Sequence, residues 1–322
     1  MALSDGSRAQ APDVTDAGVR LVGVDGGGSG VRAAVVERTD DGCFARRGEL
    51  FSHAVSPGSD AASWIEGAAD VIGRCAEGAQ RVRFGMGMPG RKTADGRGIA
   101  HALHGPVEPR FLERLEDVLA RRGVELVAEC ERLEDDGLLG CAGELFGVNG
   151  GLRGARTGYF VGGGTGLAEA FVFEGAVVAF EDAPRALERA WRLTDGAATF
   201  EERLSVRGLN QRYREAGGTH DRPEEGAHAG EEAASRVLIR AVWDLVRLVW
   251  LREQALATSF ERIVVSQRLA RVLAHEAVRP IVDETLAQVA ERGGDDRLRE
   301  RLVLSTSPAA AVVGAAARAW RA

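Results

Sequence analysis

The chain has 322 residues, 45% of them hydrophobic and 28% charged, which is typical of a soluble globular protein large enough for two domains. Its net charge of −7 argues against the basic field of a general nucleic-acid binder, and no apolar run approaches the roughly 20 residues of a membrane helix. Lys92 is the only lysine, so the Gly-Lys-Ser/Thr signature of a P-loop is absent. We expect a cytoplasmic protein that binds neither nucleic acid nor membrane.

The first half of the chain predicts a β-β-β-α-β-α order. Residues 1–18 have no basic start followed by an apolar run, so they read as a disordered leader and not as a secretory signal. The predicted elements that follow are the strands 19–25, 31–37 and 43–55, the helix 60–78, the strand 81–90 and the helix 108–123.

A similar order begins again in the second half. It comprises a strand at 124–129, a helix at 135–147, three strands within 157–180, a mostly helical segment at 184–260 with a polar loop at 215–231, a strand and a helix broken near Pro280, and a last strand and helix. Each half contains one glycine turn between strands, which is a weak repeat of architecture. We expect an N-terminal α/β domain over 19–125, a C-terminal α/β domain with a helical insertion over 126–308, and a closing helix, 309–322, packed back on the first domain.

The four cysteines, Cys43, Cys75, Cys130 and Cys141, are scattered. A disulfide framework or a zinc knuckle would require closer spacing or a matching histidine cluster. We therefore expect buried or free thiols.

The two glycine turns, "GVDGGGSG" and "GGGTG", are the strongest chemical signal. Consecutive glycines let backbone N–H groups converge on an anion, and each turn also carries a hydroxyl residue, Ser29 or Thr165. Facing each other across a cleft, the turns would clamp a polyphosphate from both sides. Asp25 would then hold a magnesium ion, directly or through water. The alternative is that Asp25 caps the backbone of its own turn.

A second signal is "EDDGLLGCAGE", where two aspartates precede a short helix. Asp at a helix start is commonly a cap, and we interpret Asp135 in this way. Asp136 lies at the junction of the two halves, where a carboxylate could accept the proton of a hydroxyl that attacks a phosphoryl group. His101 and His104 follow the Pro-Gly loop and either line the cleft or lie on the surface.

Six stretches in order resemble the sugar kinases of the ROK family, in the actin/hexokinase superfold, over nearly the whole chain from about residue 19. They are "GVDGGGSG", "FGMGMPGRKTADGRGI", "EDDGLLGCAGE", "FVGGGTGLAEA", "IVVSQRLA" and "STSPAAAVVGAAARA". The resemblance implies a two-domain α/β actin-like ATPase (ribonuclease H-like) fold with a cleft between the domains. It also implies ATP and Mg²⁺ as cofactors, and a homodimer, since dimers are common in that family.

The resemblance assigns roles residue by residue. Asp136 matches the family's general base, and Asp25 is the implied magnesium partner. The implied nucleotide-binding residues are Asp25, Gly26, Gly27, Gly28, Ser29, Gly164, Thr165, Gly166, Ser266 and Gln267. The implied acceptor-side residues are Gly87, Pro89, Gly90, His104, Asp135, Glu188 and Glu201.

The sequence also departs from the family pattern. The family's zinc loop and its Glu-x-Gly-His sugar motif are missing, with Glu188 as the stand-in for the latter, and Ser266-Gln267 replace a Gly-Gly pair on the adenosine side. We therefore expect an ATP-dependent kinase for a sugar or a sugar-like cyclitol. Two alternatives stay open: a non-catalytic sugar sensor, for which the leader is too short to hold the family's helix-turn-helix, and an ATPase that drives a partner protein.

Overall fold

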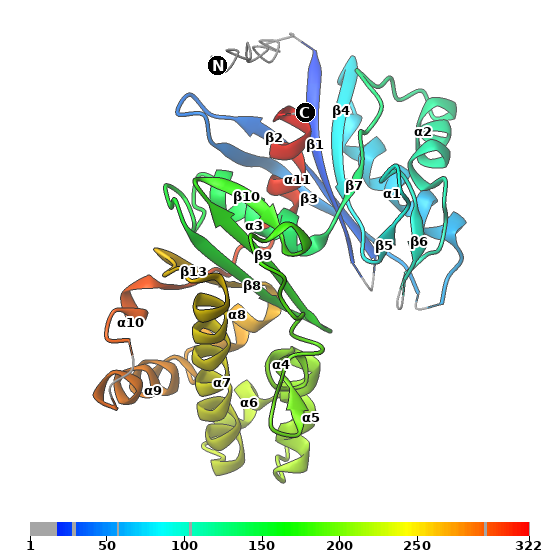
Figure 1. The fold of residues 1–322 in the computed structure, drawn as a ribbon. Helices are drawn as coiled ribbons and strands as arrows, with labels where there is room; N and C mark the ends of the chain where they lie inside the picture. The colour runs from blue at the N-terminus through cyan, green and yellow to red at the C-terminus, as the bar shows by residue number, and fades with distance from the viewer. Residues whose placement is uncertain (1–17, 28–29, 57, 103–104, 293–294, 322) are drawn as a thin grey trace, which may run out of the picture.

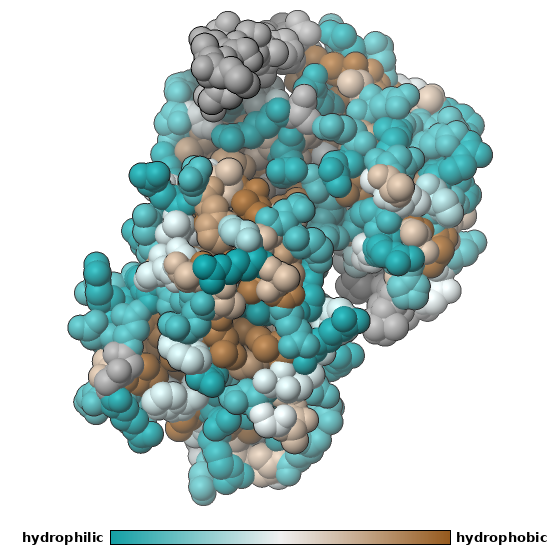
Figure 2. All heavy atoms as spheres, in the orientation of Figure 1, coloured by the Kyte–Doolittle hydropathy of each residue, from teal (hydrophilic) through white to brown (hydrophobic). Residues whose placement is uncertain are grey.

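The structure is a computed structural model that describes residues 18–27, 30–56, 58–102, 105–292 and 295–321. Two five-stranded mixed sheets form its frame (Figure 1). Apart from Gly18, the predicted leader lies outside this part of the chain. Hydrophilic residues cover most of the face that Figure 2 shows. None of the helices among the described residues has both the length and the apolar character needed to cross a membrane.

The first sheet places its earliest strand at the centre. Its order is β3 (Phe44–Ala54), β2 (Gly30–Arg38), β1 (Val19–Gly27), β4 (Arg81–Gly87) and β7 (Leu133–Glu134). The pairs β3–β2 and β2–β1 are antiparallel, whereas β1–β4 and β4–β7 are parallel. Side chains alternate along β1, so Val22 and Val24 join one core cluster and Leu21 joins another on the opposite face.

The second sheet repeats this arrangement. Its order is β10 (Ala176–Ala179), β9 (Leu167–Phe173), β8 (Gly158–Gly163), β13 (Arg262–Ser266) and β14 (Leu302–Leu304). Again the first three strands in sequence are antiparallel neighbours and the last two are parallel to the central one. Two small hairpins complete the strands: β5 (Arg91–Lys92) with β6 (Ile99–His101), and β11 (Thr194–Asp195) with β12 (Ala198–Thr199). The predicted repeat of architecture is therefore present.

Helices cover both faces of each sheet. They are α1 (Ala61–Ala76), α2 (Phe111–Arg121), α3 (Asp136–Phe146), α4 (Phe200–Leu204), α5 (Val206–Glu215), α6 (Pro223–His228), α7 (Glu232–Leu256), α8 (Gln267–Leu273), α9 (Arg279–Glu291), α10 (Leu298–Arg301) and α11 (Ala310–Arg321), with a 3₁₀ turn at Phe180–Asp182. α1 packs on one face of the first sheet and α11 on the other. α3 packs between α11 and the second sheet, whose far face carries α4, α5 and α7 to α9 (Figure 1).

Three sequence predictions were wrong in detail. Residues 124–129 form no strand; only Leu126 makes an isolated bridge, to Val82, and the sheet continues instead at β7. The predicted loop 215–231 contains α6, which begins at a proline, a residue suited to the first helical turn. Within 184–260, predicted as mostly helical, residues 184–199 form no helix and include the β11–β12 hairpin. The predicted break near Pro280 is present, because a new helix, α9, begins there.

Glycines bring α11 into backbone contact with its neighbours. A Cβ on Gly314 of α11 would lie 1.9 Å from the carbonyl oxygen of Leu139 in α3, and one on Gly143 of α3 would lie 1.8 Å from that of Ala310. On the sheet side, a Cβ on Gly23 of β1 would lie 1.8 Å from the carbonyl oxygen of Val312. No side chain other than hydrogen fits these contacts, so α11 joins β1 to α3 at the closest distance that backbones allow.

We expect Gly314→Ala to destabilise the protein by about 2 kcal/mol or more, because the new methyl group must push α11 away from α3. Gly73→Ala is the matched control, since Gly73 lies inside α1 and its Cβ would meet no atom within 4 Å. Gly73→Ala should raise the free energy of unfolding by roughly 0.5–1 kcal/mol, because alanine has the higher helix propensity. Urea unfolding measures the stability of both variants. Equal effects of the two substitutions would contradict the close contact between α11 and α3.

Candidate functional site

The first glycine turn joins β1 to β2, and Asp25 lies just before it. Asp25 is opposite Arg32 in the antiparallel register, and the Arg32 guanidinium donates to the Asp25 carboxylate at 2.5 Å. Asp25 is 6% exposed. Its burial raises the pKa of the carboxyl, and the charge of Arg32 opposes that shift. The sequence analysis did not identify Arg32. Pairing the two strands across the glycine turn would have placed Arg32 opposite Asp25. Gly28 and Ser29 lie outside the described residues.

Three loops meet at the carboxyl edge of the first sheet. Asp25 of β1 is the register neighbour of Gly87 at the end of β4, and Gly87 in turn is the neighbour of Glu134 in β7. Asp135 and Asp136 follow β7 directly. Because parallel strands end at the same edge, the glycine turn, the loop after β4 and the start of α3 lie side by side.

The loop after β4, residues 87–90, packs tightly against the glycine turn. A Cβ on Gly26 would lie 2.1 Å from the sulfur of Met88 and 3.0 Å from the carbonyl oxygen of Gly87. Gly90 has φ +101°, a conformation that favours glycine. Pro89 lies between Gly87 and Gly90 in the loop, and its Cγ is 3.4 Å from the position of a Cβ on Gly105. The predicted acceptor-side loop is thus adjacent to the first turn, while His104 lies outside the described residues.

Asp136 opens α3, and its carboxylate accepts the N–H of Gly137 at 2.8 Å. The residue is half-buried. Burial, followed by the negative charges of Asp25 and Asp135, raises its pKa to about 6, while the Gly137 N–H and Lys92 act in the opposite direction. The influence of Asp25 reflects how close the first turn lies to the start of α3. A carboxyl with such a pKa can accept a proton near neutral pH.

Asp135 differs from the sequence interpretation. It occupies the N-cap position of α3, but its side chain makes no capping hydrogen bond. It instead accepts from the Lys92 ammonium at 2.7 Å, across 43 positions of sequence.

The second glycine turn lies at the corresponding edge of the second sheet. It joins β8 to β9, and the Gly164 N–H donates to the Gly166 carbonyl at 2.9 Å. Glu201, predicted on the acceptor side, contacts this turn by accepting the N–H of Leu167 at 3.1 Å. A pocket of about 300 Å³ opens beside the turn, lined by Gly164, Thr165, Val206, Arg207, Asn210, Arg214 and Arg268. Its three arginines give it the cationic character that an anionic ligand needs.

Ser266 ends β13 and Gln267 begins α8 next to this turn, as register neighbours of Gly162 and Gly163. The Ser266 hydroxyl is directed inward, to buried Glu144 at 3.5 Å. Gln267 has φ +61°, a strained conformation for a residue with a side chain. Its amide lies over Gly162, 2.7 to 2.9 Å from where a Cβ would be. The backbone at position 267 thus has a conformation that suits glycine, although the residue there is glutamine.

Glu188, the predicted stand-in for the sugar motif, has an exposed side chain in the segment between the 3₁₀ turn and α4. Among the described residues, no group of three or more His, Cys, Asp or Glu side chains is arranged to hold a metal ion. The four cysteines are buried and free.

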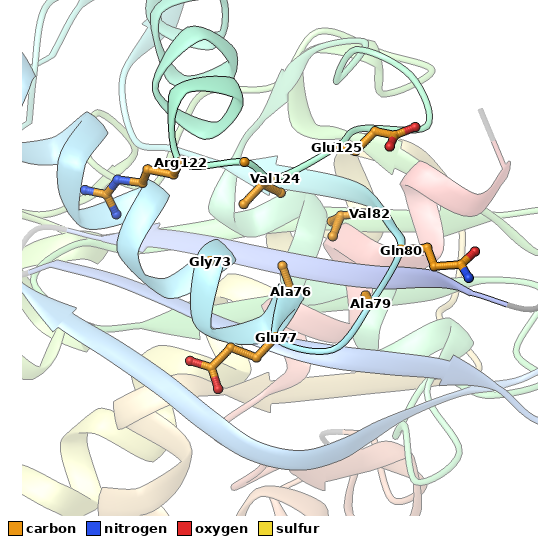
Figure 3. Close-up of a pocket in the computed structure, with 10 residues that line it drawn as sticks. Gly73, Ala76, Glu77, Ala79, Gln80, Val82, Arg122, Val124 and Glu125 are labelled. Atoms are coloured by element: carbon orange, nitrogen blue, oxygen red, sulfur yellow. The ribbon is translucent and has the colours of Figure 1, made fainter.

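A second hollow, of about 200 Å³, lies at the opposite end of the first sheet (Figure 3). It is bounded by the end of α1, the end of α2 and Val82 near the start of β4. Val82 and Gly87 are five residues apart on one strand, which corresponds to about 17 Å. This hollow is therefore separate from the candidate site.

Comparison with solved structures identifies the fold. No protein-family model and no curated protein matches the sequence. A ROK-family glucokinase from Streptomyces griseus, solved with glucose and AMPPNP, is 19% identical with a TM-score of 0.66 over 94% of this chain and 100% of that one. A ROK hexokinase from Thermus thermophilus is 18% identical, TM-score 0.61, over 94% and 98%. A ROK-family transcriptional regulator, a homologue of the E. coli MLC protein, is 13% identical, TM-score 0.66, over 95% and 78%. The predicted actin-like ATPase fold of the ROK sugar kinases is confirmed.

The raised pKa of Asp136 predicts a pH-dependent stability. Between the unfolded value near 3.8 and the folded value near 6, the folded chain binds a proton that the unfolded chain does not, so stability falls as the pH rises through this window. We expect Asp136→Asn to be more stable than wild type at about pH 8, by roughly 1–3 kcal/mol, with the gain shrinking toward about pH 4.5. Urea unfolding at each pH measures this. Asp117→Asn, a substitution at an exposed position of α2, is the control. A gain in the free energy of unfolding of Asp136→Asn that does not vary with pH would contradict the raised pKa of Asp136.

Proposed function

We propose that the protein is an ATP-dependent kinase that phosphorylates a hydroxyl of a sugar or sugar-like cyclitol. The observation that carries this proposal is the meeting of the Asp25 turn, the 87–90 loop and Asp136 at one sheet edge, in a fold shared with sugar kinases. The S. griseus glucokinase with this fold binds glucose and AMPPNP. The departures from the family's sugar motif, described above, favour an acceptor other than a standard hexopyranose.

In this proposal Asp136 is the general base. It accepts the proton of the acceptor hydroxyl as that oxygen attacks the γ-phosphorus of ATP, and the bond from the phosphorus to the β-γ bridging oxygen breaks to release ADP. A carboxyl with a pKa of about 6 is ionised at neutral pH and still basic enough to share that proton. Asp135 and the 87–90 loop would contact the acceptor. Glu201 contacts the second turn, so a role on the nucleotide side is also consistent with its position.

The nucleotide would lie between the two glycine turns. Backbone N–H groups of Gly26, Gly27, Thr165 and Gly166 would face its phosphates, and the arginine-lined pocket beside Thr165 would add positive charge. Asp25 suits Mg²⁺, since one carboxylate plus phosphate oxygens is a common magnesium environment, and the hydrogen bond that the structure gives it from Arg32 goes to Oδ2. Magnesium would neutralise charge on the transferred phosphoryl group. We further propose that the two sheets belong to two domains that close over the substrates and exclude water. The predicted boundary between 19–125 and 126–308 lies too early, because Leu133 and Glu134 pair with β4 in the first sheet.

A regulatory protein is the second candidate, because the ROK transcriptional regulator matches this fold as well as the glucokinase does. A screen of hexoses, aminosugars and cyclitols with ATP and Mg²⁺ separates the two candidates. Transfer of phosphate to any acceptor supports the kinase. Sugar binding without transfer supports the regulator.

We expect Asp136→Asn to reduce phosphoryl transfer at least about 100-fold, because the amide cannot accept the hydroxyl proton. ATP binding should stay within about twofold of wild type, since the residue faces the acceptor. Steady-state kinetics and calorimetry measure the two effects. Asp117→Asn again serves as the control, and full turnover of Asp136→Asn would rule out its role as base.

Gly27→Val should block ATP binding without unfolding the protein. A Cβ on Gly27 would meet no atom within 4 Å, so the new side chain enters open space where the phosphates are proposed to lie. We expect at least a tenfold loss of ATP affinity with an unchanged melting temperature. An unchanged ATP affinity in the folded variant would show that the phosphate site is elsewhere.

A further inference from the structure

Lys92 makes an unusual set of contacts for a charged residue at the edge of a sheet. Its ammonium donates to three oxygens: the carbonyls of Met88 at 2.8 Å and Gly90 at 2.7 Å, and Oδ1 of Asp135 at 2.7 Å. Its side chain is only 13% exposed. The single ammonium thereby joins the 87–90 loop to the residue that precedes Asp136.

These contacts explain why the chain uses lysine here. Of its 41 basic residues, Lys92 is the only one that is not arginine. An ammonium is a compact charge with three donors that radiate from one atom, which suits three oxygens around a point. The guanidinium of arginine is a planar fork that is built for paired oxygens in one plane. The site therefore requires lysine geometry and not just positive charge.

The hydrogen bond from Lys92 uses only one of the two oxygens of the Asp135 carboxylate. Asp135 has 47% of its side chain exposed, and the hydrogen bond that the structure gives it goes through Oδ1 to Lys92. Asp135 makes no side-chain capping hydrogen bond to α3, the helix that it precedes. The ammonium neutralises the carboxylate and fixes its orientation, so Oδ2 can accept hydrogen bonds from a ligand beside Asp136. Because a carboxylate cannot donate, the ligand groups that it contacts must be donors.

We propose that Lys92 is the positioning residue of the acceptor site, and that it orients Asp135 to bind a second hydroxyl of a neutral polyol, one or two carbons from the hydroxyl that Asp136 deprotonates. This inference rests on the proposed kinase function. It narrows the acceptor to uncharged polyhydroxy compounds with a free hydroxyl near the reacting one. An acidic sugar would place a carboxylate against Asp135 and would be disfavoured.

The test uses kinetics of the full chain with the best neutral acceptor from the screen. Lys92→Met keeps the length of the side chain and removes its charge, whereas Lys92→Arg keeps the charge. We expect both to raise the KM for the acceptor roughly 10- to 100-fold, as the loss of a charge-assisted hydrogen bond would, with the KM for ATP within about twofold. Arg91→Met is the matched control, because Arg91 is exposed on the same short strand, and it should behave as wild type.

A second arm keeps the proposal testable if Lys92 variants fold poorly. Asp135→Ala should raise the KM for the acceptor, but not for a deoxy analogue that lacks the neighbouring hydroxyl. The proposal is wrong if either Lys92 variant keeps the wild-type acceptor KM, if the KM for ATP rises together with the KM for the acceptor, or if Asp135→Ala affects both acceptors equally. Failure of the wild type to phosphorylate any acceptor would overturn the kinase function itself, and this inference with it.

Discussion

The backbone contact of α11 with both β1 and α3 is the constraint on which the rest of the structure depends. Gly23, Gly143 and Gly314 allow main chains to meet where any side chain would collide with a carbonyl oxygen. Close packing of this kind transmits position rigidly, because a packed backbone cannot yield by changing a rotamer. The glycine turn that ends β1 and the helix start at Asp136 are therefore held in one fixed relation by a helix from the far end of the sequence.

This relation gathers three carboxylates at one sheet edge and pairs only two of them with cations. Arg32 compensates Asp25, and Lys92 compensates Asp135. Asp136 has no such ion pair among the described residues; its bond is to the Gly137 N–H, and it is affected by burial and by the charges of its neighbours. Burial without a cationic partner is what raises the pKa of Asp136 to about 6, so this carboxyl can take up a proton near neutral pH.

The second sheet has the same topology as the first, but different side chains border its glycine turn. Its glycine turn is bordered by arginines and by the strained Gln267, where the first turn is bordered by carboxylates. A cationic edge suits a polyphosphate, whereas the acidic residues at the first edge suit a metal ion and a hydroxyl acceptor. Repetition of one strand order therefore provides two edges whose side chains differ in charge.

Local sequence determined the strands on either side of the two glycine turns, the longer amphipathic helices and the placement of Asp25 and Asp136 at strand and helix ends. These depend on neighbours a few residues away, through alternation, glycine turns and helix starts. Tertiary structure alone decided that residues 124–129 form only an isolated bridge, that the Ser266 hydroxyl is directed to Glu144, and that Asp135 contacts Lys92 instead of capping its helix. The direction of a polar side chain is set by whichever partner lies within hydrogen-bond distance, and in the last two cases that partner comes from 122 and 43 positions away.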